Sequence, residues 1–446
     1  RQLAPAALLV ETTPAPEPRH PQEQGSLRTL AVGSPADLAA LPHDEIVDLP
    51  DRVLLPGLVN AHAHLDLTHI GPRPYDPADG FVTWVDMVRR ERRTDLDGIA
   101  ASVRRGIELS LAGGTVAVGD IAGAALGRPT LTPFETLAAS PLAGVSYLEF
   151  FGIARSLDRA RAALRDLLAL PDLWHPGPLR LGLQPHAPNT VDLDLFLETA
   201  RAAAARGLPI STHLAETPEE AEFIARAAGP QRNFLESLGL WDPDTPPTGV
   251  GVGRHPIEHL LPALRTAPFV AAHVNDCPDA ALPLLAATPT SVAYCPHASD
   301  YFGHTAARGR HRYADMLAAG INVCLGTDSI INLPAAVASG PNARISVLDA
   351  MRRLYARDAA DPVLLLEMGT VRGARALGLR ESAFRFEPGA PLAGLIAVRV
   401  DPWVVDRVGP IAACCLDADD PPELLSLCKK SALTGVPVEA VSAEGA

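Results

Sequence analysis

Lysine is almost absent from this sequence. Only Lys429 and Lys430 occur among the 446 residues, and every other basic side chain apart from histidine is arginine. The simplest explanation is a genome-wide bias towards arginine codons. The absence still limits the chemistry, because the first 428 residues offer no lysine side chain to a site.

Long apolar runs and paired cysteines are absent as well. No stretch approaches the roughly 18 apolar residues that span a membrane, and the opening segment does not have the basic flank and apolar core of a secretion signal. None of the six cysteines forms a CxxC pair, which excludes zinc-finger and redox spacings. We therefore expect reduced thiols, a cytoplasmic location and no membrane partner.

An excess of positive charge is also missing. The net charge is −14 at pH 7, which disfavours a polyanion such as nucleic acid as a partner. Any nucleobase-like substrate is therefore expected to be a free small molecule. With 47% hydrophobic and 20% charged residues, the chain can bury a sizeable core. Its length suggests two or three domains, or one large barrel with a small module.

Short apolar runs alternate with amphipathic stretches of helical length from Leu54 onward. Each run is continuous, which is typical of parallel strands that are buried on both faces. Helix ends are marked too: the stretch 97–114 ends at a glycine pair, and Thr217 is placed to cap a helix that starts at Pro218. The eight strand-like runs are 55–62, 115–120, 143–150, 179–186, 208–213, 269–273, 291–296 and 321–328.

Eight strand-and-helix units predict an α/β fold, a (β/α)₈ TIM barrel over residues 56–380. A doubly wound open sheet is the alternative, but eight units with polar strand ends favour a sheet that closes into a barrel. Residues 1–55 are rich in proline, and residues 381–446 contain short strand-like pieces such as 395–400. We predict that these two end segments together form a small β-sandwich-like module beside the barrel.

Polar side chains recur at the carboxyl ends of the predicted strands, where barrel enzymes place their chemistry. His62 and His64 end the first run, and because they are two residues apart they point the same way from a strand. Two converging imidazoles suit a borderline metal such as Zn²⁺. An HxH pair alone is weak evidence, but four further runs end in His186, His213, His273 and Asp328. The set predicts a metal site at this end of the barrel.

The segments that carry these residues resemble the amidohydrolase superfamily. They read PGLVNAHAHLD at 56–66, STHLAE at 211–216, VAAHVND at 270–276 and LGTDS at 325–329. The HxxE step from His213 to Glu216 is similar to that of the mononuclear deaminases and triazine chlorohydrolases. The layout that follows it is similar to that of aminodeoxyfutalosine and other adenosine-derivative deaminases.

The resemblance implies a role for each residue of the site. Glu216 shuttles protons and His273 contacts the metal-bound water. The residue types agree with this, because a metal ion with an open position acidifies its bound water and a buried carboxyl can protonate a ring nitrogen. The alternative for Glu216 is a solvated residue in the first turn of a helix. The implied metal ligands are His62, His64, His213 and Asp328.

The missing lysines bear on the number of metal ions. Binuclear members of the superfamily bridge two metals with a carbamylated lysine on the fourth strand. Here the fourth run ends LGLQPH at 181–186, and the barrel has no lysine. We therefore expect a single divalent ion, with zinc as the first choice and iron as the alternative.

Two residues are assigned to substrate binding. His186 lies in PHAPNT at 185–190, which resembles the PHAPYT segment of nucleoside-type deaminases, although a structural histidine is the alternative. Trp84 lies in an amphipathic stretch, 79–93, and could stack on a base, while one arginine of this stretch could meet a substrate carboxylate. The alternative is a packed surface helix with a solvated basic end, which we favour for most of Arg89, Arg90, Arg92 and Arg93.

The leading hypothesis is hydrolytic deamination of an aminopurine-like or adenosine-like small molecule, in which hydroxide attacks the amino-bearing ring carbon. A second hypothesis keeps the metal centre but has another leaving group, as in chlorohydrolases and amide hydrolases. A third is a catalytically silent scaffold, which the complete ligand set disfavours. A homodimer is expected from the resemblance alone.

Overall fold

The computed structural model describes residues 6–13, 26–170, 173–174, 177–244, 246–401, 411–417 and 419–425. Within these residues, no helix combines the length and the apolar character needed to cross a bilayer. Lys429, Lys430 and Cys428 lie outside the described residues.

Eight strands form one parallel sheet whose order follows the chain, from β4 to β11. A parallel bridge between Ala63 and Asp328 joins the first and last strands, so the sheet nearly closes on itself. The predicted TIM barrel is therefore confirmed. Its strands are β4 (Leu58–Ala63), β5 (Thr115–Ala122), β6 (Ala143–Phe150), β7 (Leu179–Pro185), β8 (Ile210–Leu214), β9 (Phe269–His273), β10 (Ser291–Tyr294) and β11 (Asn322–Leu325).

The strands read as continuous apolar runs because both of their faces are covered. Every residue of β4, β5, β8 and β9 is buried. One face points into the barrel and the other meets the surrounding helices. The helices between the strands are α2 (Phe81–Glu91), α3 (Leu96–Ala112), α4 (Thr132–Ala138), α5 (Leu157–Leu168), α6 (Leu193–Arg206), α7 (Pro218–Arg226), α8 (Pro230–Ser237), α9 (Pro256–Leu264), α10 (Leu282–Ala286), α11 (Pro296–Tyr301), α12 (His304–Arg308) and α13 (Tyr313–Ala318).

The helix ends follow the local sequence signals. The Asp95 side chain accepts from the backbone N–H of Gly98 at the start of α3, and α6 ends at Gly207 in the left-handed conformation, with φ at 65°. Thr217 caps α7 as predicted, accepting from the N–H of Glu220. After β11 the chain continues through α14 (Ala335–Ala338), α15 (Val347–Asp358), α16 (Pro362–Met368) and α17 (Val371–Ala376).

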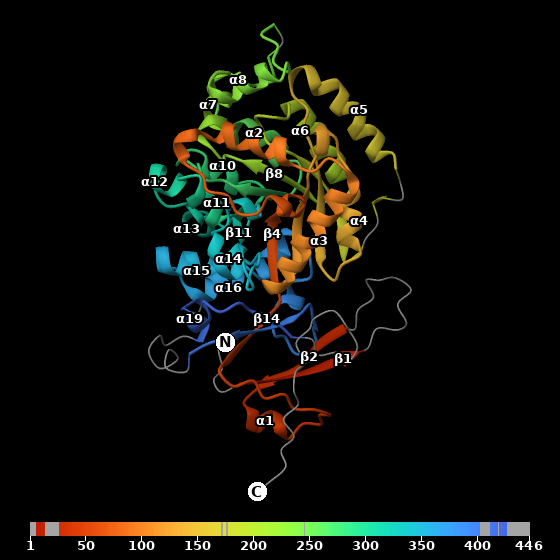
Figure 1. Ribbon diagram of the computed structural model, residues 1–446, viewed down its shortest axis with the longest axis vertical. Helices are drawn as coiled ribbons and strands as arrows, with labels where there is room; N and C mark the ends of the chain where they lie inside the picture. The colour runs from red at the N-terminus through yellow and green to blue at the C-terminus, as the bar shows by residue number, and fades with distance from the viewer. Residues whose placement is uncertain are drawn as a thin grey trace.

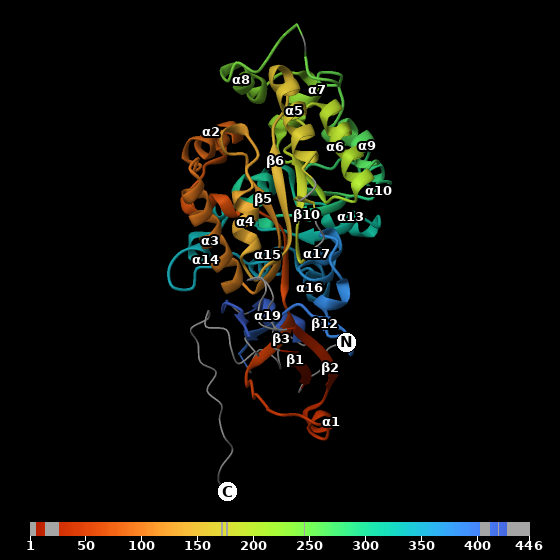
Figure 2. The ribbon, with the colours of Figure 1, turned by 90° about the vertical axis from the view of Figure 1, so that its right-hand side faces the viewer.

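Both chain ends contribute strands to two small antiparallel sheets outside the barrel (Figures 1 and 2). One sheet joins β1 (Ala7–Thr13), β2 (Ser26–Gly33) and β12 (Pro391–Leu392). The other joins β3 (Arg52–Pro56), β13 (Leu395–Arg399) and β14 (Glu423–Leu424), beside α19 (Ile411–Asp417). The predicted β module from both ends is thus present, with α1 (Pro35–Ala39) following β2. Its exact limits stay a prediction, and its segments 14–25, 402–410 and 426–446 lie outside the described residues.

The small module and the carboxyl ends of the barrel strands lie at opposite ends of the barrel (Figure 1). Only Gly57 separates β3 of the module from β4 of the barrel. The module therefore lies at the amino end of β4, below the barrel in Figure 1. The carboxyl ends of the barrel strands, where His64 and Asp328 follow β4 and β11, face away from it.

Candidate active site

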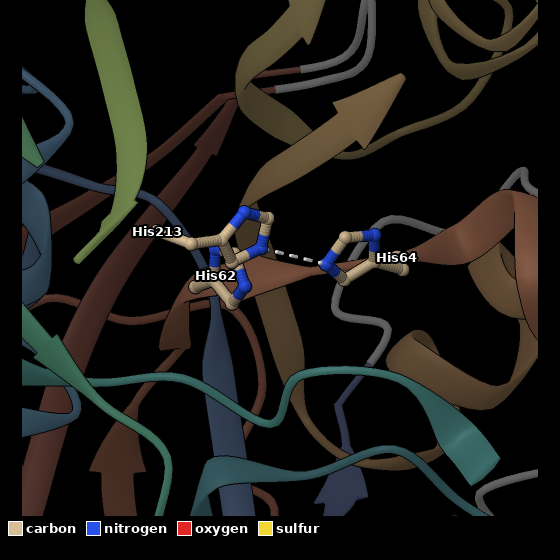
Figure 3. Close-up of side chains that lie close together, drawn as sticks. All are labelled: His62, His64 and His213. Atoms are coloured by element: carbon tan, nitrogen blue, oxygen red, sulfur yellow. Dashed lines mark hydrogen bonds between the residues drawn. The ribbon is translucent and has the colours of Figure 1, made fainter. Parts of the chain in front are cut away.

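Three imidazoles meet at the carboxyl ends of β4 and β8 (Figure 3). His62 lies within β4, His64 follows its last residue, and His213 lies near the end of β8. The Nε2 atoms of His64 and His213 are 3.3 Å apart. The ring of His62 stands nearly perpendicular to the other two, with centroid distances of 5.1 and 5.0 Å. The predicted convergence of these three side chains is therefore present.

Asp328 brings a carboxylate to the same point. It follows β11 in a left-handed backbone conformation, with φ at 59°. Its Oδ1 lies 3.7 Å from Nε2 of His62 and 3.4 Å from Nε2 of His64. Its Oδ2 accepts a hydrogen bond of 2.6 Å from the Asn332 amide. Burial alone would raise the pKa of Asp328, but the neighbouring imidazoles hold this pKa below its ordinary value.

This donor set fits a divalent metal ion. Both ring nitrogens of His62 are buried with no hydrogen-bond partner among the described residues, a costly state unless something else binds them. Three imidazole nitrogens and one carboxylate oxygen are ligands that suit zinc. His213 is oriented as a ligand should be, because its Nδ1 lies 3.1 Å from the carbonyl of His186, leaving Nε2 to face the site.

Glu216 and His273 lie together beside the four candidate ligands. Nε2 of His273, the last residue of β9, is 3.5 Å from Oε1 of Glu216. Burial raises the pKa of Glu216 well above its ordinary value, and the nearby Asp328 carboxylate raises it further. Burial also lowers the pKa of His273 to about 3. Burial thus favours the uncharged form of both side chains, and a carboxyl group whose pKa is raised in this way suits proton delivery.

The backbone that carries Glu216 is held on both sides. The Glu220 carboxylate accepts from the N–H groups of Ala215 and Glu216, each at 2.8 Å. The Asn275 amide donates to the carbonyl of Glu216, and the N–H of Asp276 donates to that of Ala215. Ala215 itself has a positive φ of 49°, an uncommon conformation for a residue with a side chain. These four hydrogen bonds hold the loop in this conformation.

His186, the first of the two predicted substrate contacts, lies next to the candidate centre. It follows β7, and its ring centroid is 4.8 Å from that of His213. Its Nε2 lies 3.9 Å from Oε1 of Glu149, the penultimate residue of β6. The structure thus brings His186 to the site, together with a carboxylate that the sequence analysis did not single out.

Glu149 belongs to a buried cluster of charges that the sequence analysis missed. Its Oε2 lies 3.2 Å from the guanidinium of Arg92, which in turn contacts Asp66 at 3.2 Å. The Arg92 side chain is only 14% exposed, whereas those of Arg89 and Arg90 are 53% and 64% exposed. Burial alone would raise the pKa of Glu149, but the Arg92 guanidinium keeps it below its ordinary value.

A signal for Glu149 was present in the sequence. The run AGVSYLEF, 143–150, is apolar except for two positions, and its glutamate lies at the carboxyl end like the histidines of the other runs. The same rule applies to Asp120 in the second run, whose carboxylate accepts from the N–H of Leu65 beside His64. No comparable signal separated Arg92 from the arginines around it.

Trp84, the second predicted substrate contact, lies in an aromatic cluster between α2 and α11. Its ring stacks on Phe81 at 5.6 Å and meets Phe302 edge-on at 5.1 Å. These contacts are those of the packed helix given as the alternative. A direct role in substrate binding stays a prediction.

A cavity of about 530 Å³ lies near the candidate site, although none of the four candidate ligands is part of its wall. Asn332, which donates to Asp328, is part of its wall, as are the stacked rings of Tyr75 and Tyr301. The walls come from the segments that follow β4, β10 and β11, so the cavity lies at the carboxyl face of the barrel. It has the size of a small-molecule site.

Comparison with known proteins identifies the family. The amidohydrolase family model matches residues 53–414. The aminodeoxyfutalosine deaminase of Deinococcus radiodurans is 32% identical over 377 residues, covering 80% of this chain and 80% of that protein. The chain belongs to the amidohydrolase family. The resemblance predicted from the motifs is thereby confirmed, and with it a hydrolase acting on carbon–nitrogen bonds.

Two further proteins illustrate the likeness. The 5-methylthioadenosine/S-adenosylhomocysteine deaminase of Moorella thermoacetica is 28% identical over 372 residues, covering 80% of this chain and 76% of that protein. Among solved structures, a zinc-bound adenosine deaminase from Xanthomonas campestris superposes with a TM-score of 0.65 at 21% identity, covering 88% of this chain and 84% of that one. At this identity the structural likeness supports the fold alone.

Proposed function

We propose that this amidohydrolase is a hydrolytic deaminase of an aminopurine-like or adenosine-like small molecule, with one divalent ion at its centre. The observation that carries the proposal is the convergence of His62, His64, His213 and Asp328 beside the Glu216–His273 pair. The deaminase names of the two curated relatives support the class of reaction. Zinc is the expected ion, given the donor set and the zinc in the Xanthomonas enzyme.

A divalent ion held by these four residues would supply a Lewis acid and make a water molecule acidic. Asp328 is placed to take up a proton from the water that attacks the amino-bearing ring carbon. Glu216, whose pKa is raised by burial, is placed to give a proton to the adjacent ring nitrogen. The surroundings of the two carboxyl groups thus shift their pKa values in opposite directions, up for Glu216 and down for Asp328. The proton that Asp328 took from the water then passes to the amino group, which leaves as ammonia, while the Glu216 carboxylate takes the proton of the newly added hydroxyl.

His273 orients the reacting groups. Its φ of 70° is unusual for a residue with a side chain, and its carbonyl lies 2.9 Å from Nε2 of His311. This contact fixes the strand end so that the His273 ring faces Glu216 and Asp328. Such strain at a strand end is common where side-chain placement serves a function. A cytoplasmic enzyme that acts as a homodimer is the setting we propose for this reaction.

The variant Glu216→Gln tests the proposal. We expect ammonia release from aminopurines and adenosine derivatives to fall about a hundredfold or more, because the amide cannot give up a proton in the same way. Metal content should not change, since Glu216 is not among the proposed ligands. The assay is ammonia release across a panel of aminopurines, aminopyrimidines and chlorotriazines.

Glu236→Gln is the matched control, because it makes the same chemical change at an exposed carboxylate that pairs with Arg232 on α8. Full activity of Glu216→Gln would remove this residue from the mechanism. Release of chloride rather than ammonia would assign the centre to the chlorohydrolase reaction instead. No turnover of any compound by the metal-loaded chain would favour a silent scaffold.

A further inference from the structure

The chain turns through an uncommon backbone conformation at the end of β9. His273 and Val274 both have positive φ angles, of 70° and 51°, although neither is a glycine. The backbone N–H of Val274 donates to the carbonyl of Leu214 at 2.9 Å, which joins this turn to β8. A conformation of this kind persists only where the surrounding structure enforces it. Other contacts must therefore hold the turn.

His311, in the segment before α13, makes one of these contacts. Its Nε2 lies 2.9 Å from the carbonyl oxygen of His273, and because a carbonyl can only accept, Nε2 carries the proton. Burial lowers the pKa of His311 to about 4, which favours the neutral ring. Both side chains are buried, so loss of this hydrogen bond would be costly. The bond fixes the peptide group that follows the His273 ring.

The ring of His311 is itself held by an aromatic stack. It lies nearly parallel to the ring of Tyr294, the last residue of β10, with centroids 3.8 Å apart and an angle of 15° between the planes. Tyr313 of α13 is nearly parallel to Tyr294 as well, at 5.8 Å. The three packed rings leave His311 little freedom to turn, so its N–H stays directed at the carbonyl of His273.

An arginine of α15 fixes the far side of the stack. The guanidinium of Arg357 donates to the Tyr294 hydroxyl at 3.0 Å and to both carboxylate oxygens of Asp358 at 2.9 Å. The Tyr313 hydroxyl donates to the same carboxylate at 3.2 Å. Little of either charged side chain is exposed, so water competes weakly for these bonds. A continuous set of contacts thus runs from α15 through Tyr294 and His311 to His273.

We infer that His311 is a positioning residue that acts through His273, and that Tyr294 holds His311 in place for this role. The inference rests on the proposed function and adds two residues to it. Nε2 of His273 lies 3.5 Å from Oε1 of Glu216, so a small rotation of the turn would separate these two groups. A misplacement of about 1 Å in an active site can lower the rate about a hundredfold.

The variants His311→Phe and His311→Gln test the inference as a pair. Phenylalanine keeps a ring against Tyr294 but has no N–H, whereas the glutamine amide can still donate to the carbonyl of His273. The assay is steady-state ammonia release from adenosine by the metal-loaded chain. In His311→Phe we expect kcat to fall about tenfold or more, while KM changes by less than about twofold and metal content stays the same. His311→Gln should recover most of the lost kcat.

Two further variants separate positioning from stability. His259→Phe is the matched control, because His259 is a fully buried histidine on α9 whose ring lies next to Gly249, and it receives the same change. It should keep its kcat. Tyr294→Leu, which removes the stacked ring, should lower kcat in the same way as His311→Phe. The thermal unfolding midpoint of each variant shows whether it is folded.

Three kinetic results would overturn the inference. A kcat of His311→Phe within about twofold of the unmodified chain would remove His311 from the reaction. An equal loss of kcat in His311→Phe and His311→Gln would mean that the ring matters for packing and the hydrogen bond does not. A loss of kcat that follows a loss of metal would place the effect at the metal ligands.

Failure of the deaminase proposal would look different, because no ammonia would be released from any compound of the panel. The contact can then be measured without turnover, by NMR of the chain labelled with ¹³C in its histidine rings. We expect the His273 signal, assigned by its loss in His273→Asn, to shift in His311→Phe and to return towards its original position in His311→Gln. An unshifted His273 signal in His311→Phe would contradict the inference whatever reaction the centre performs.

Discussion

Arg92 lies between two carboxylates at the edge of the proposed site. Its guanidinium contacts Asp66 and Glu149, whose side chains are 3% and 2% exposed. Taking three charged groups out of water is unfavourable unless each has a partner. The cluster therefore holds Glu149 in place and depends on Arg92 for its charge balance.

The variant Arg92→Gln should unfold more easily. We expect the free energy of unfolding to fall by about 3–5 kcal/mol, because two buried carboxylates would lose their cation. Urea unfolding followed by circular dichroism measures this. Arg90→Gln, at a 64% exposed position in the last turn of α2, is the control and should change this free energy by less than about 0.5 kcal/mol. An equally small change in Arg92→Gln would contradict the role given to the cluster.

Among single residues, the sequence predicted the candidate metal ligands but did not predict the buried arginine beside the site. The histidines and Asp328 could be predicted because each ends an apolar run, and strand ends share one face of a barrel. Arg92 could not be separated from Arg89, Arg90 and Arg93, because its burial depends on where α2 crosses the barrel mouth. That crossing is set by tertiary packing and leaves no local pattern.

The segment from β8 to α7 is the element that joins the metal centre to the proton donor. His213 lies in the strand, Glu216 in the loop and Glu220 in the first turn of the helix. The buried Glu220 carboxylate binds two backbone N–H groups of the loop, those of Ala215 and Glu216. The helix thus fixes the loop from one side, and Asn275 fixes it from the other.

Glu220 is expected to act as a positioning residue. In Glu220→Gln, the amide NH₂ would face one of the two backbone N–H donors, so one hydrogen bond is lost and Glu216 shifts. We expect kcat to fall about tenfold or more while KM and metal content stay nearly constant, because only the placement of the proton donor changes. Steady-state kinetics with metal analysis tests this.

The half-buried Glu222 on the same helix provides the matched control, Glu222→Gln, which should keep its kcat. A fall in stability without a change in kcat would mean that Glu220 serves the fold alone.

The sequence predicted most elements closely and one junction poorly. The runs 143–150 and 269–273 coincide with β6 and β9, because these strands are buried along nearly their whole length. The first run, 55–62, instead spans the end of β3 and most of β4, which belong to different sheets. Gly57 marks the break: a Cβ there would lie 2.5 Å from the Val116 side chain. This close approach is a tertiary contact that an apolar run does not reveal.

In the molecule as a whole, the small sheets and the candidate centre are at opposite ends of the barrel. The two small sheets lie at the amino end of β4, and the candidate centre lies at the carboxyl ends of the barrel strands. Strands β2 and β3 from the start of the chain pair with β12 and β13 from its end. That both ends form one module could be predicted from the loss of helical texture. The pairing could not, because it depends on contacts more than 300 residues apart in the chain, such as Val53 with Val398.

The most direct test of the account is the metal content of the active protein, measured by elemental analysis alongside ammonia release. We predict about one transition-metal ion per chain, loss of activity on chelation and its return with zinc. His62→Asn should lose both metal and activity, while His43→Asn, at an exposed histidine, should keep both. An active chain that holds no transition metal, or a His62→Asn variant that keeps its full metal content, would contradict the central claim.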